Sequence, residues 1–162
     1  MADLDDLRRS LKSPDVSVRA AAAESLCQVG EDAVSAAVDL VCATGDDESV
    51  QVWAVAALEE LGPPSRDNVD PLIKLIPDQQ TIVAYWAITL LGRLGETAVA
   101  AEPALADRVL NATDIAVRER AVWALSKMGP QSNSAMEALQ VVADSDSHRL
   151  ASMAQAALPD VE

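Results

Sequence analysis

The sequence is poor in aromatic residues and contains no phenylalanine at all. Its aromatic residues are Trp53, Tyr85, Trp86 and Trp123. Alanine is abundant throughout, and half of the chain, 50%, is hydrophobic. A β-sandwich relies on aromatic and β-branched residues, whereas alanine has the highest helix propensity and allows helices to pack closely. The composition therefore disfavours a β-sandwich and favours closely packed helices.

Basic residues are also scarce. There are 12 Lys and Arg against 26 Asp and Glu, so the formal net charge is −14 and the isoelectric point is about 4.3. Such a surface repels phosphate groups on average, which disfavours nucleic acids and anionic membranes as partners. No apolar run of about 18 residues is present, so we expect no membrane-spanning segment. The charge favours a neutral or basic protein or peptide partner.

Residues that carry catalytic or metal chemistry are few. The chain has two cysteines, Cys27 and Cys42, and one histidine, His148, and their spacing is not that of a zinc site. No phosphate-binding glycine loop, nucleophile elbow or catalytic triad is evident. We therefore expect no cofactor, no metal and no enzymatic activity. With no disulfide framework and no signal peptide, we expect a cytoplasmic protein with reduced thiols.

An internal repeat organises the chain. Gly30, Gly62, Gly95 and Gly129 follow one another at spacings of 32, 33 and 34 residues. Aligning these glycines brings three apolar columns into register, spaced four residues apart. The columns are Val18, Val50, Val83, Val117 and Leu150; Ala22, Ala54, Ala87, Ala121 and Ala154; and Leu26, Leu58, Leu91, Leu125 and Leu158. A spacing of four residues places the three columns on one face of a helix.

Each repeat is predicted to contain two helices, A and B, joined by a short turn. The expected B-helix starts are Ser13-Pro14, Asp46 or Asp47, Asp78, Thr113, and Ser145 or Asp146. The four glycines would end these helices in the left-handed conformation. Shorter apolar segments precede them and predict the A helices, at residues 4–11, 33–42, 69–76, 99–110 and 135–142.

We therefore expect an all-α protein, an α-solenoid of five antiparallel helix pairs. A lone helix pair cannot bury its apolar face, whereas stacked pairs can. No shift in composition indicates a second domain, so residues 1–162 are predicted to form one repeat domain. The expected units are approximately 1–30, 31–62, 63–95, 96–129 and 130–162.

The repeat resembles a known family. Asp15-x-x-Val18-Arg19 and Asp114-x-x-Val117-Arg118, followed by alanine pairs, Ala-Leu and glycine, resemble armadillo/HEAT-like repeats, especially the short repeats of phycobilisome lyases. Gln51, Ala84 and Ala151 depart from the arginine, which weakens any continuous Asp–Arg ladder. The resemblance implies a scaffold, because fold alone does not specify chemistry. Di-iron hydroxylases of this family need several His-Glu pairs, which one histidine cannot supply.

The resemblance also implies that the B helices line the concave face. Counting the valine column as zero, positions 0, 4, 8 and 11 are expected in the core, and positions 2, 3, 6 and 10 face the groove. All four aromatic residues fall at groove positions. Their rings would either line an exposed docking groove or fill the space between adjacent B helices. Charge at these positions runs from acidic to mixed or basic, which would orient a partner. The candidate partner-binding residues are Trp53, Tyr85, Trp86, Trp123, Glu60, Arg93, Glu119, Arg120 and Lys127.

The first hypothesis is a non-catalytic protein–protein interaction scaffold that binds a peptide, helix or partner domain on the concave B-helix face. The alternative is a HEAT-like enzyme of the chromophore-lyase or alkylpurine DNA glycosylase type. In such an enzyme the rings would cradle a flat chromophore or a cationic base, with Glu119 or Glu60 as the acidic group. A third hypothesis is self-assembly, in which two copies pair as a homodimer.

Overall fold

The computed structural model describes residues 3–160, and every regular element among them is a helix. The predicted all-α solenoid of stacked helix pairs is thereby confirmed. The chain forms two compact units, residues 1–68 and 69–162, and the division falls within the third expected repeat. Organisation as a single domain over residues 1–162 stays a prediction, and its first two and last two residues lie outside the described range.

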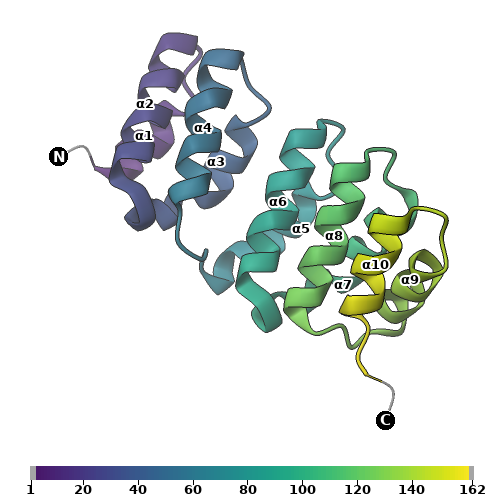
Figure 1. Cartoon of the computed structure of the whole chain (residues 1–162). Coiled ribbons are helices and arrows are strands. Elements are labelled where there is room, and N and C mark those ends of the chain that lie inside the picture. The colour runs from purple at the N-terminus through teal and green to yellow at the C-terminus, as the bar shows by residue number, and fades with distance from the viewer. Residues whose placement is uncertain (1–2, 161–162) are drawn as a thin grey trace. The chain divides into compact units, whose positions relative to one another are not determined.

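The first unit contains two helix pairs (Figure 1). Its elements are α1 (Leu4–Ser10), α2 (Val16–Val29), η1 (Gly30–Ala36), α3 (Ala37–Ala43), α4 (Glu48–Glu60) and η2 (Arg66–Asn68). The B helices α2 and α4 pack side by side, while α1 packs on α2 and α3 on α4. The 3₁₀ segment η1 precedes α3 and forms the start of the second A helix. The first unit thus consists of one layer of A helices, α1 and α3, and one layer of B helices, α2 and α4.

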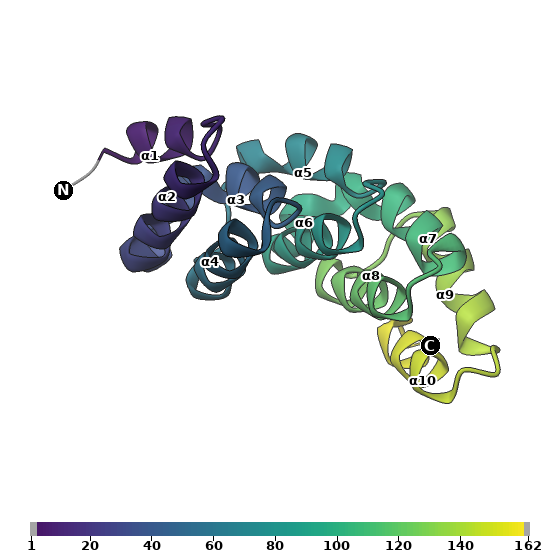
Figure 2. The ribbon, with the colours of Figure 1, turned by 90° about the horizontal axis from the view of Figure 1, so that it is seen from above.

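The second unit contains three helix pairs. Its elements are α5 (Val69–Leu75), α6 (Thr81–Leu94), η3 (Gly95–Ala101), α7 (Glu102–Asn111), α8 (Ile115–Met128), α9 (Asn133–Ala143) and α10 (His148–Ala157). The B helices α6, α8 and α10 lie side by side, and α5, α7 and α9 form the other layer (Figure 2). We call the solvent-facing surface of α6, α8 and α10 the B-helix face.

The apolar columns form the core as predicted, with two deviations. All five residues of the alanine column are buried, and in the leucine column only Leu158 is partly exposed. The other deviation is Val18, which is 41% exposed, whereas Val50 is 0% exposed beneath its neighbours. Because α2 is the first B helix, no earlier helix pair among residues 3–160 covers Val18. Val50 and Val117, by contrast, stand on α4 and α8, each of which packs against the B helix before it in the same unit.

The N-cap residues of the B helices lie one or two residues later than predicted, except for α4 at Asp47. The expected starts at Ser13-Pro14, Asp78, Thr113, and Ser145 or Asp146 are wrong. The N-cap residues form their own column three positions before the valine column: Asp15, Asp47, Gln80, Asp114 and Ser147. In the three aspartates of this column the carboxylate accepts a hydrogen bond from the backbone N–H two residues on, which stabilises the first turn. The Asp-x-x-Val motif therefore marks the helix start.

Three of the four repeat glycines end a helix with positive φ, but of these only Gly129, with ψ of 80°, has the predicted left-handed conformation, whereas ψ is −137° at Gly30 and −134° at Gly95. The φ angles are 68° at Gly30, 57° at Gly95 and 70° at Gly129. The prediction for Gly62 is wrong: α4 ends at Glu60, and Leu61 is already extended, with ψ of 134°. An extended chain leads directly into the two prolines that follow Gly62, so no left-handed residue is needed there.

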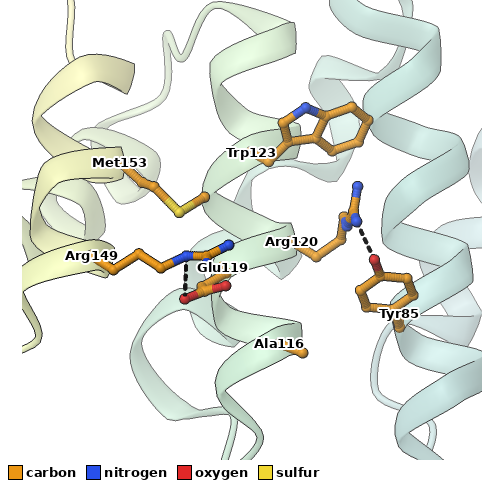
Figure 3. Close-up of a pocket in the computed structure, with 7 residues that line it drawn as sticks. All are labelled: Tyr85, Ala116, Glu119, Arg120, Trp123, Arg149 and Met153. Carbon is orange, nitrogen blue, oxygen red and sulfur yellow. Dashed lines mark hydrogen bonds and ion pairs between the residues drawn. The ribbon is translucent and has the colours of Figure 1, made fainter.

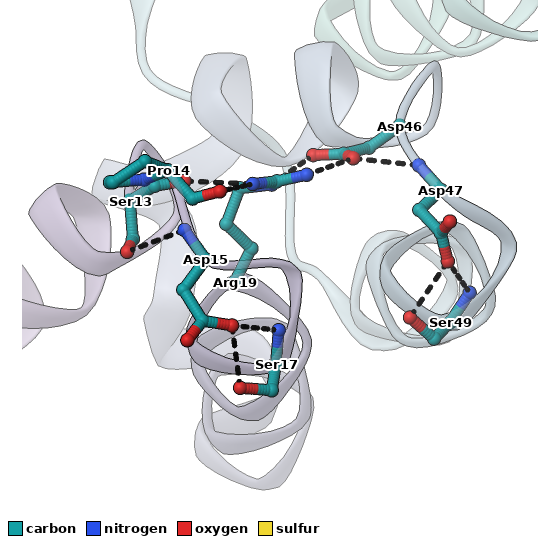
Figure 4. Close-up of polar contacts among 8 residues, drawn as sticks. All are labelled: Ser13, Pro14, Asp15, Ser17, Arg19, Asp46, Asp47 and Ser49. Carbon is teal, nitrogen blue, oxygen red and sulfur yellow. Dashed lines mark hydrogen bonds and ion pairs between the residues drawn. The ribbon is translucent and has the colours of Figure 1, made fainter.

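An arginine–aspartate pair links the first two repeats (Figure 4). Arg19 donates to both carboxylate oxygens of Asp46, at 2.6 and 2.8 Å, and to the carbonyl of Ser13 at 2.8 Å. The hydrogen bond from Arg19 lowers the pKa of Asp46. Gln51 and Arg118 occupy the same repeat position as Arg19, one residue after the valine column. Gln51 donates to the carbonyl of Thr44, and Arg118 donates to the carbonyl of Val109. The three polar residues at this repeat position therefore satisfy carbonyls in or just after the preceding A helix, which the alanines at the same position cannot do.

Glu102 provides a second link between repeats, within the second unit. This residue is 1% exposed at the start of α7, and its carboxylate accepts from the backbone N–H of Gln131 at 3.1 Å and of Ser132 at 2.7 Å. A buried carboxylate is stable only when its oxygens are hydrogen-bonded. Glu102 therefore anchors the loop that precedes α9.

The segment Thr81–Asn111 is long and apolar enough to cross a membrane by length and composition. However, 56% of its apolar window is buried inside the protein, and the segment comprises α6, η3 and α7. The backbone turns at Gly95, where φ is 57°. The packing of α6 in the core accounts for the apolar composition of this segment.

Candidate functional site

A pocket of about 290 Å³ opens on the B-helix face between α6, α8 and α10 (Figure 3). Seven residues line it: Tyr85, Ala116, Glu119, Arg120, Trp123, Arg149 and Met153. The three helices lie side by side because alanines of the buried column allow close approach. Side chains that α6, α8 and α10 present toward one another therefore meet at one site.

Arg120 is held between two aromatic rings. Its guanidinium carbon lies 4.6 Å from the centroid of the Tyr85 ring and 4.9 Å from that of Trp123. The guanidinium also donates a hydrogen bond to the hydroxyl oxygen of Tyr85. Both ring contacts are within the range of cation–π attraction. The two rings and the hydroxyl therefore fix the direction of the Arg120 side chain.

Trp123 owes its position to a glycine on the neighbouring helix. A Cβ atom placed on Gly92 of α6 would lie 2.3 Å from the Cζ3 atom of Trp123. Real side chains do not approach this closely, so only glycine leaves room for the indole. The absence of a side chain at Gly92 therefore lets α6 and α8 hold Trp123 between them.

The opposite wall of the pocket contains an ion pair and a methionine. Arg149 of α10 donates from Nε to Oε1 of Glu119 on α8, at 3.1 Å. The Arg149 side chain is 77% exposed, whereas that of Glu119 is 21% exposed. Met153 stands one turn further along α10 and presents its thioether to the pocket. The pocket thus combines aromatic surface, a thioether, two arginines and one carboxylate.

Four of the predicted binding residues meet in this pocket: Tyr85, Glu119, Arg120 and Trp123. The expectation that Trp86 faces an open groove is wrong, because its side chain is only 8% exposed. Trp86 packs edge-on against Tyr85, with ring centroids 6.0 Å apart and an interplanar angle of 85°. Arg93 lies over its ring at 5.8 Å. The Trp86 ring is therefore a packing residue and does not line an exposed groove.

The remaining predicted residues do not line the pocket. Lys127 is exposed in the last turn of α8. Trp53, which is 37% exposed, and the exposed Glu60 both belong to α4 in the first unit. Of the residues predicted on α6 and α8, four line the pocket, whereas Trp86, Arg93 and Lys127 do not.

Sequence reasoning missed Ala116, Arg149, Met153 and Gly92. Met153 occupies the same repeat position as Arg120, so the repeat alignment contained the signal for it. Ala116 and Arg149 stand one residue before the valine column, a position that was not considered. The role of Gly92 left no signal in the repeat pattern, because it depends on a single ring from the next helix.

The arrangement suits binding better than acid–base chemistry. Glu119, the one carboxylate of the pocket, is already paired with Arg149. Within residues 3–160, no group of three or more His, Cys, Asp or Glu side chains is placed to hold a metal ion. Tyr, Trp and Arg are the residues that most often anchor partners at protein interfaces.

The sequence profile of HEAT repeats matches residues 4–78 and 69–159, which together span nearly the whole chain. The chain belongs to the HEAT repeat family. This assignment confirms the resemblance carried by the Asp-x-x-Val motif, and it agrees with the stacked helix pairs. No curated protein matches the chain.

Solved structures with the same fold include designed and natural proteins. An engineered protein aligns with a TM-score of 0.65 at 20% identity, covering 97% of this chain and 80% of that one. Computationally designed armadillo repeat proteins for modular peptide recognition align with a TM-score of 0.64 at 21% identity, covering 96% and 80%. The complex of CpcE and CpcF of phycocyanin lyase from Nostoc sp. PCC7120 aligns with a TM-score of 0.62 at 18% identity, covering 95% and 96%. At these identities the likeness concerns the fold.

Proposed function

We propose that this HEAT repeat protein is a non-catalytic scaffold that binds a peptide, helix or partner domain on its B-helix face. The pocket between α6, α8 and α10 is the centre of the proposed contact. The observation that carries the proposal is the meeting of Tyr85, Arg120, Trp123 and Met153 around one open pocket of about 290 Å³. Covering such rings and their arginine supplies much of the binding free energy in protein interfaces.

The fold of the similar proteins supports this proposal. One of them is a set of designed armadillo proteins made for modular peptide recognition, and another is a complex of two chains, CpcE and CpcF. Both are similar to this chain in fold. A protein or peptide partner for this chain agrees with both examples.

An enzyme that stacks a cationic base or flat chromophore between the rings gains no support from the site. The guanidinium of Arg120 already occupies the space between Tyr85 and Trp123. A cationic ligand would have to displace it, so the cation–π contacts that the ligand forms would only replace those that Arg120 already makes. The scaffold hypothesis requires no such displacement.

Site-directed photo-crosslinking in the cells that make the protein tests the proposal. A photoreactive phenylalanine analogue replaces Ala116, which is exposed and lines the pocket, and in a matched variant it replaces Ser126, which is exposed on the same helix outside the pocket. We expect adducts with a protein at position 116 that are absent at position 126. An adduct with a second copy of the chain identifies the homodimer. No adduct, or equal adducts at both positions, contradicts the proposal.

Truncation of one ring provides a second measure. Trp123→Ala should abolish the adduct, whereas Trp53→Ala, which removes an exposed ring from α4, should leave it unchanged. Circular dichroism melting of both variants shows whether the fold persists. Retention of the adduct in a folded Trp123→Ala protein contradicts a role for this pocket.

A further inference from the structure

We infer that the pocket recognises an acidic–apolar segment of its partner, in which an aspartate or glutamate stands next to an apolar side chain. The inference rests on the proposed function and specifies its ligand. It assigns the carboxylate to Arg120 and Arg149, and the apolar side chain to Trp123 and Met153.

Arg120 is prepared to receive a carboxylate. A guanidinium group carries five N–H donors. Within residues 3–160, Arg120 donates a hydrogen bond to the Tyr85 hydroxyl, which leaves donors for a ligand. The rings of Tyr85 and Trp123 hold its position, so little side-chain freedom is lost when a ligand binds. A planar guanidinium pairs with a carboxylate through two parallel hydrogen bonds, which no neutral side chain can match. The remaining donors therefore favour an acidic ligand group.

The apolar part of the site lies directly beside this arginine. The Trp123 indole is partly exposed in the pocket, and Met153 and Ala116 complete the apolar lining. Methionine adapts to apolar groups of different shape. An apolar side chain adjacent to the carboxylate would cover Trp123 while the carboxylate contacts Arg120. Recognition of the pair explains why aromatic and cationic groups share one pocket.

The local charge has the opposite sign from the whole chain. The chain carries −14, which led us to expect a neutral or basic partner, but the pocket contains Arg120 and Arg149 against Glu119 alone. Lys127 lies exposed on the same helix, which adds a further positive charge to α8. Interactions between exposed charges are screened beyond about 8 Å at physiological ionic strength. Groups inside the pocket therefore decide which ligand charge is bound.

Glu119 acts in this scheme as an internal competitor. Its carboxylate occupies Nε of Arg149 at 3.1 Å, and it would repel an incoming carboxylate. Removing its charge should therefore strengthen the binding of an acidic ligand. The same change should weaken a basic ligand, so the two signs of ligand charge give opposite results.

Selection from a library of randomised peptides displayed on phage tests the inference. The immobilised full chain is compared with Trp123→Ala and with Trp53→Ala as the matched control. We expect enriched peptides in which Asp or Glu stands next to an apolar residue, with enrichment lost on Trp123→Ala and kept on Trp53→Ala. Fluorescence anisotropy then gives the affinity of an enriched peptide and of its counterpart with Gln or Asn at each acidic position.

We expect four results from the affinity measurements. Arg120→Gln should weaken the acidic peptide about tenfold or more, because a charge-assisted pair is lost. Lys127→Gln, which removes the same charge from the same helix outside the pocket, should change it less than about threefold. Glu119→Gln should bind it more tightly than the wild type. Replacing the acidic residues of the peptide should weaken binding to the unaltered protein by a factor similar to that of Arg120→Gln, and this measurement needs no protein variant.

The outcomes separate this inference from the proposed function. Enriched peptides that depend on Trp123 but carry Lys, Arg or no charge overturn the inference and leave the scaffold function standing. Acidic peptides that bind Glu119→Gln more weakly, or that are indifferent to Arg120→Gln, also overturn the inference. An absence of any peptide that depends on Trp123 counts against both.

Discussion

Trp123 of α8 packs directly on Gly92 of α6, at a distance that leaves no room for a side chain on α6. A Cβ at Gly92 would meet Cζ3, Cε3 and Cη2 of the indole at 2.3, 2.9 and 3.0 Å. The same ring holds the guanidinium of Arg120. The contact thus connects the packing of two B helices with the shape of the pocket.

Gly92→Ala is expected to displace the indole of Trp123 and to lower the free energy of unfolding by about 1–3 kcal/mol, as overpacking does. Because Arg120 rests on the same ring, peptide binding should weaken as well. Thermal melting measures the loss of stability, tryptophan fluorescence reports the displacement of the indole, and fluorescence anisotropy gives the peptide affinity.

Gly62→Ala is the matched control for this prediction. Its nearest neighbours for an added Cβ lie at 3.6 Å or more, and its φ is not positive. It should be neutral or stabilising by about 0.4–1 kcal/mol, because alanine reduces the entropy of the unfolded chain. An equal loss of stability in both variants would show that the indole contact is not responsible.

Glu102→Ala should destabilise the second unit by about 1.5–3 kcal/mol, because it leaves the backbone N–H groups of Gln131 and Ser132 without their acceptor. Glu102→Gln should cost less, since one side-chain oxygen still accepts. Urea unfolding measures the difference, with Glu96→Ala as control because Glu96 is exposed in η3. A loss in Glu102→Ala no larger than in Glu96→Ala would contradict the anchoring role.

The sequence predicted most of the fold because the fold is periodic. Columns of valine, alanine and leucine recur with the helix pairs, and burial follows them except at Val18 and Leu158. The helix starts were misplaced because several Ser, Thr and Asp residues precede each B helix, and any of them can cap. At α8 the structure selects Asp114, which is extended with ψ of 124° and whose carboxylate accepts from the backbone N–H of Ala116.

The site was predicted less completely than the fold. Repeat positions indicated which residues face outward, and Tyr85, Glu119, Arg120 and Trp123 do line one pocket. Periodicity could not indicate that Trp86 turns inward, because its burial depends on the sizes of the side chains around it. Contacts between neighbouring repeats decide these details, and a single repeat position does not encode them.

Acid should weaken the link between the first two repeats. Arg19 holds the pKa of Asp46 below its usual value, chiefly through the hydrogen bond between them. A lowered folded-state pKa means that the contribution is fully present above the unfolded pKa of about 3.9 and is lost as the pH falls from there through the folded value. Asp46→Asn removes this contribution at every pH.

The measurement is thermal melting of the wild type and Asp46→Asn at neutral pH and near pH 3. The advantage of the wild type over the variant should shrink in acid, while both share the effects of Asp15, Asp39 and Asp107, whose pKa values are also lowered. A difference in melting temperature that stays constant with pH would exclude the Arg19–Asp46 pair as its source.

The tryptophans should divide into structural and surface residues. Trp86→Ala should lower the free energy of unfolding by about 3–5 kcal/mol, the usual cost of removing a buried indole, because Trp86 is 8% exposed. Trp53 is 37% exposed, so Trp53→Ala should cost much less. Chemical unfolding gives the two values, and acrylamide quenching of variants that retain a single tryptophan reports access to each ring. Trp86 should be the more shielded, since it is buried against Tyr85, and equal quenching of Trp86 and Trp53 would contradict its place in the core.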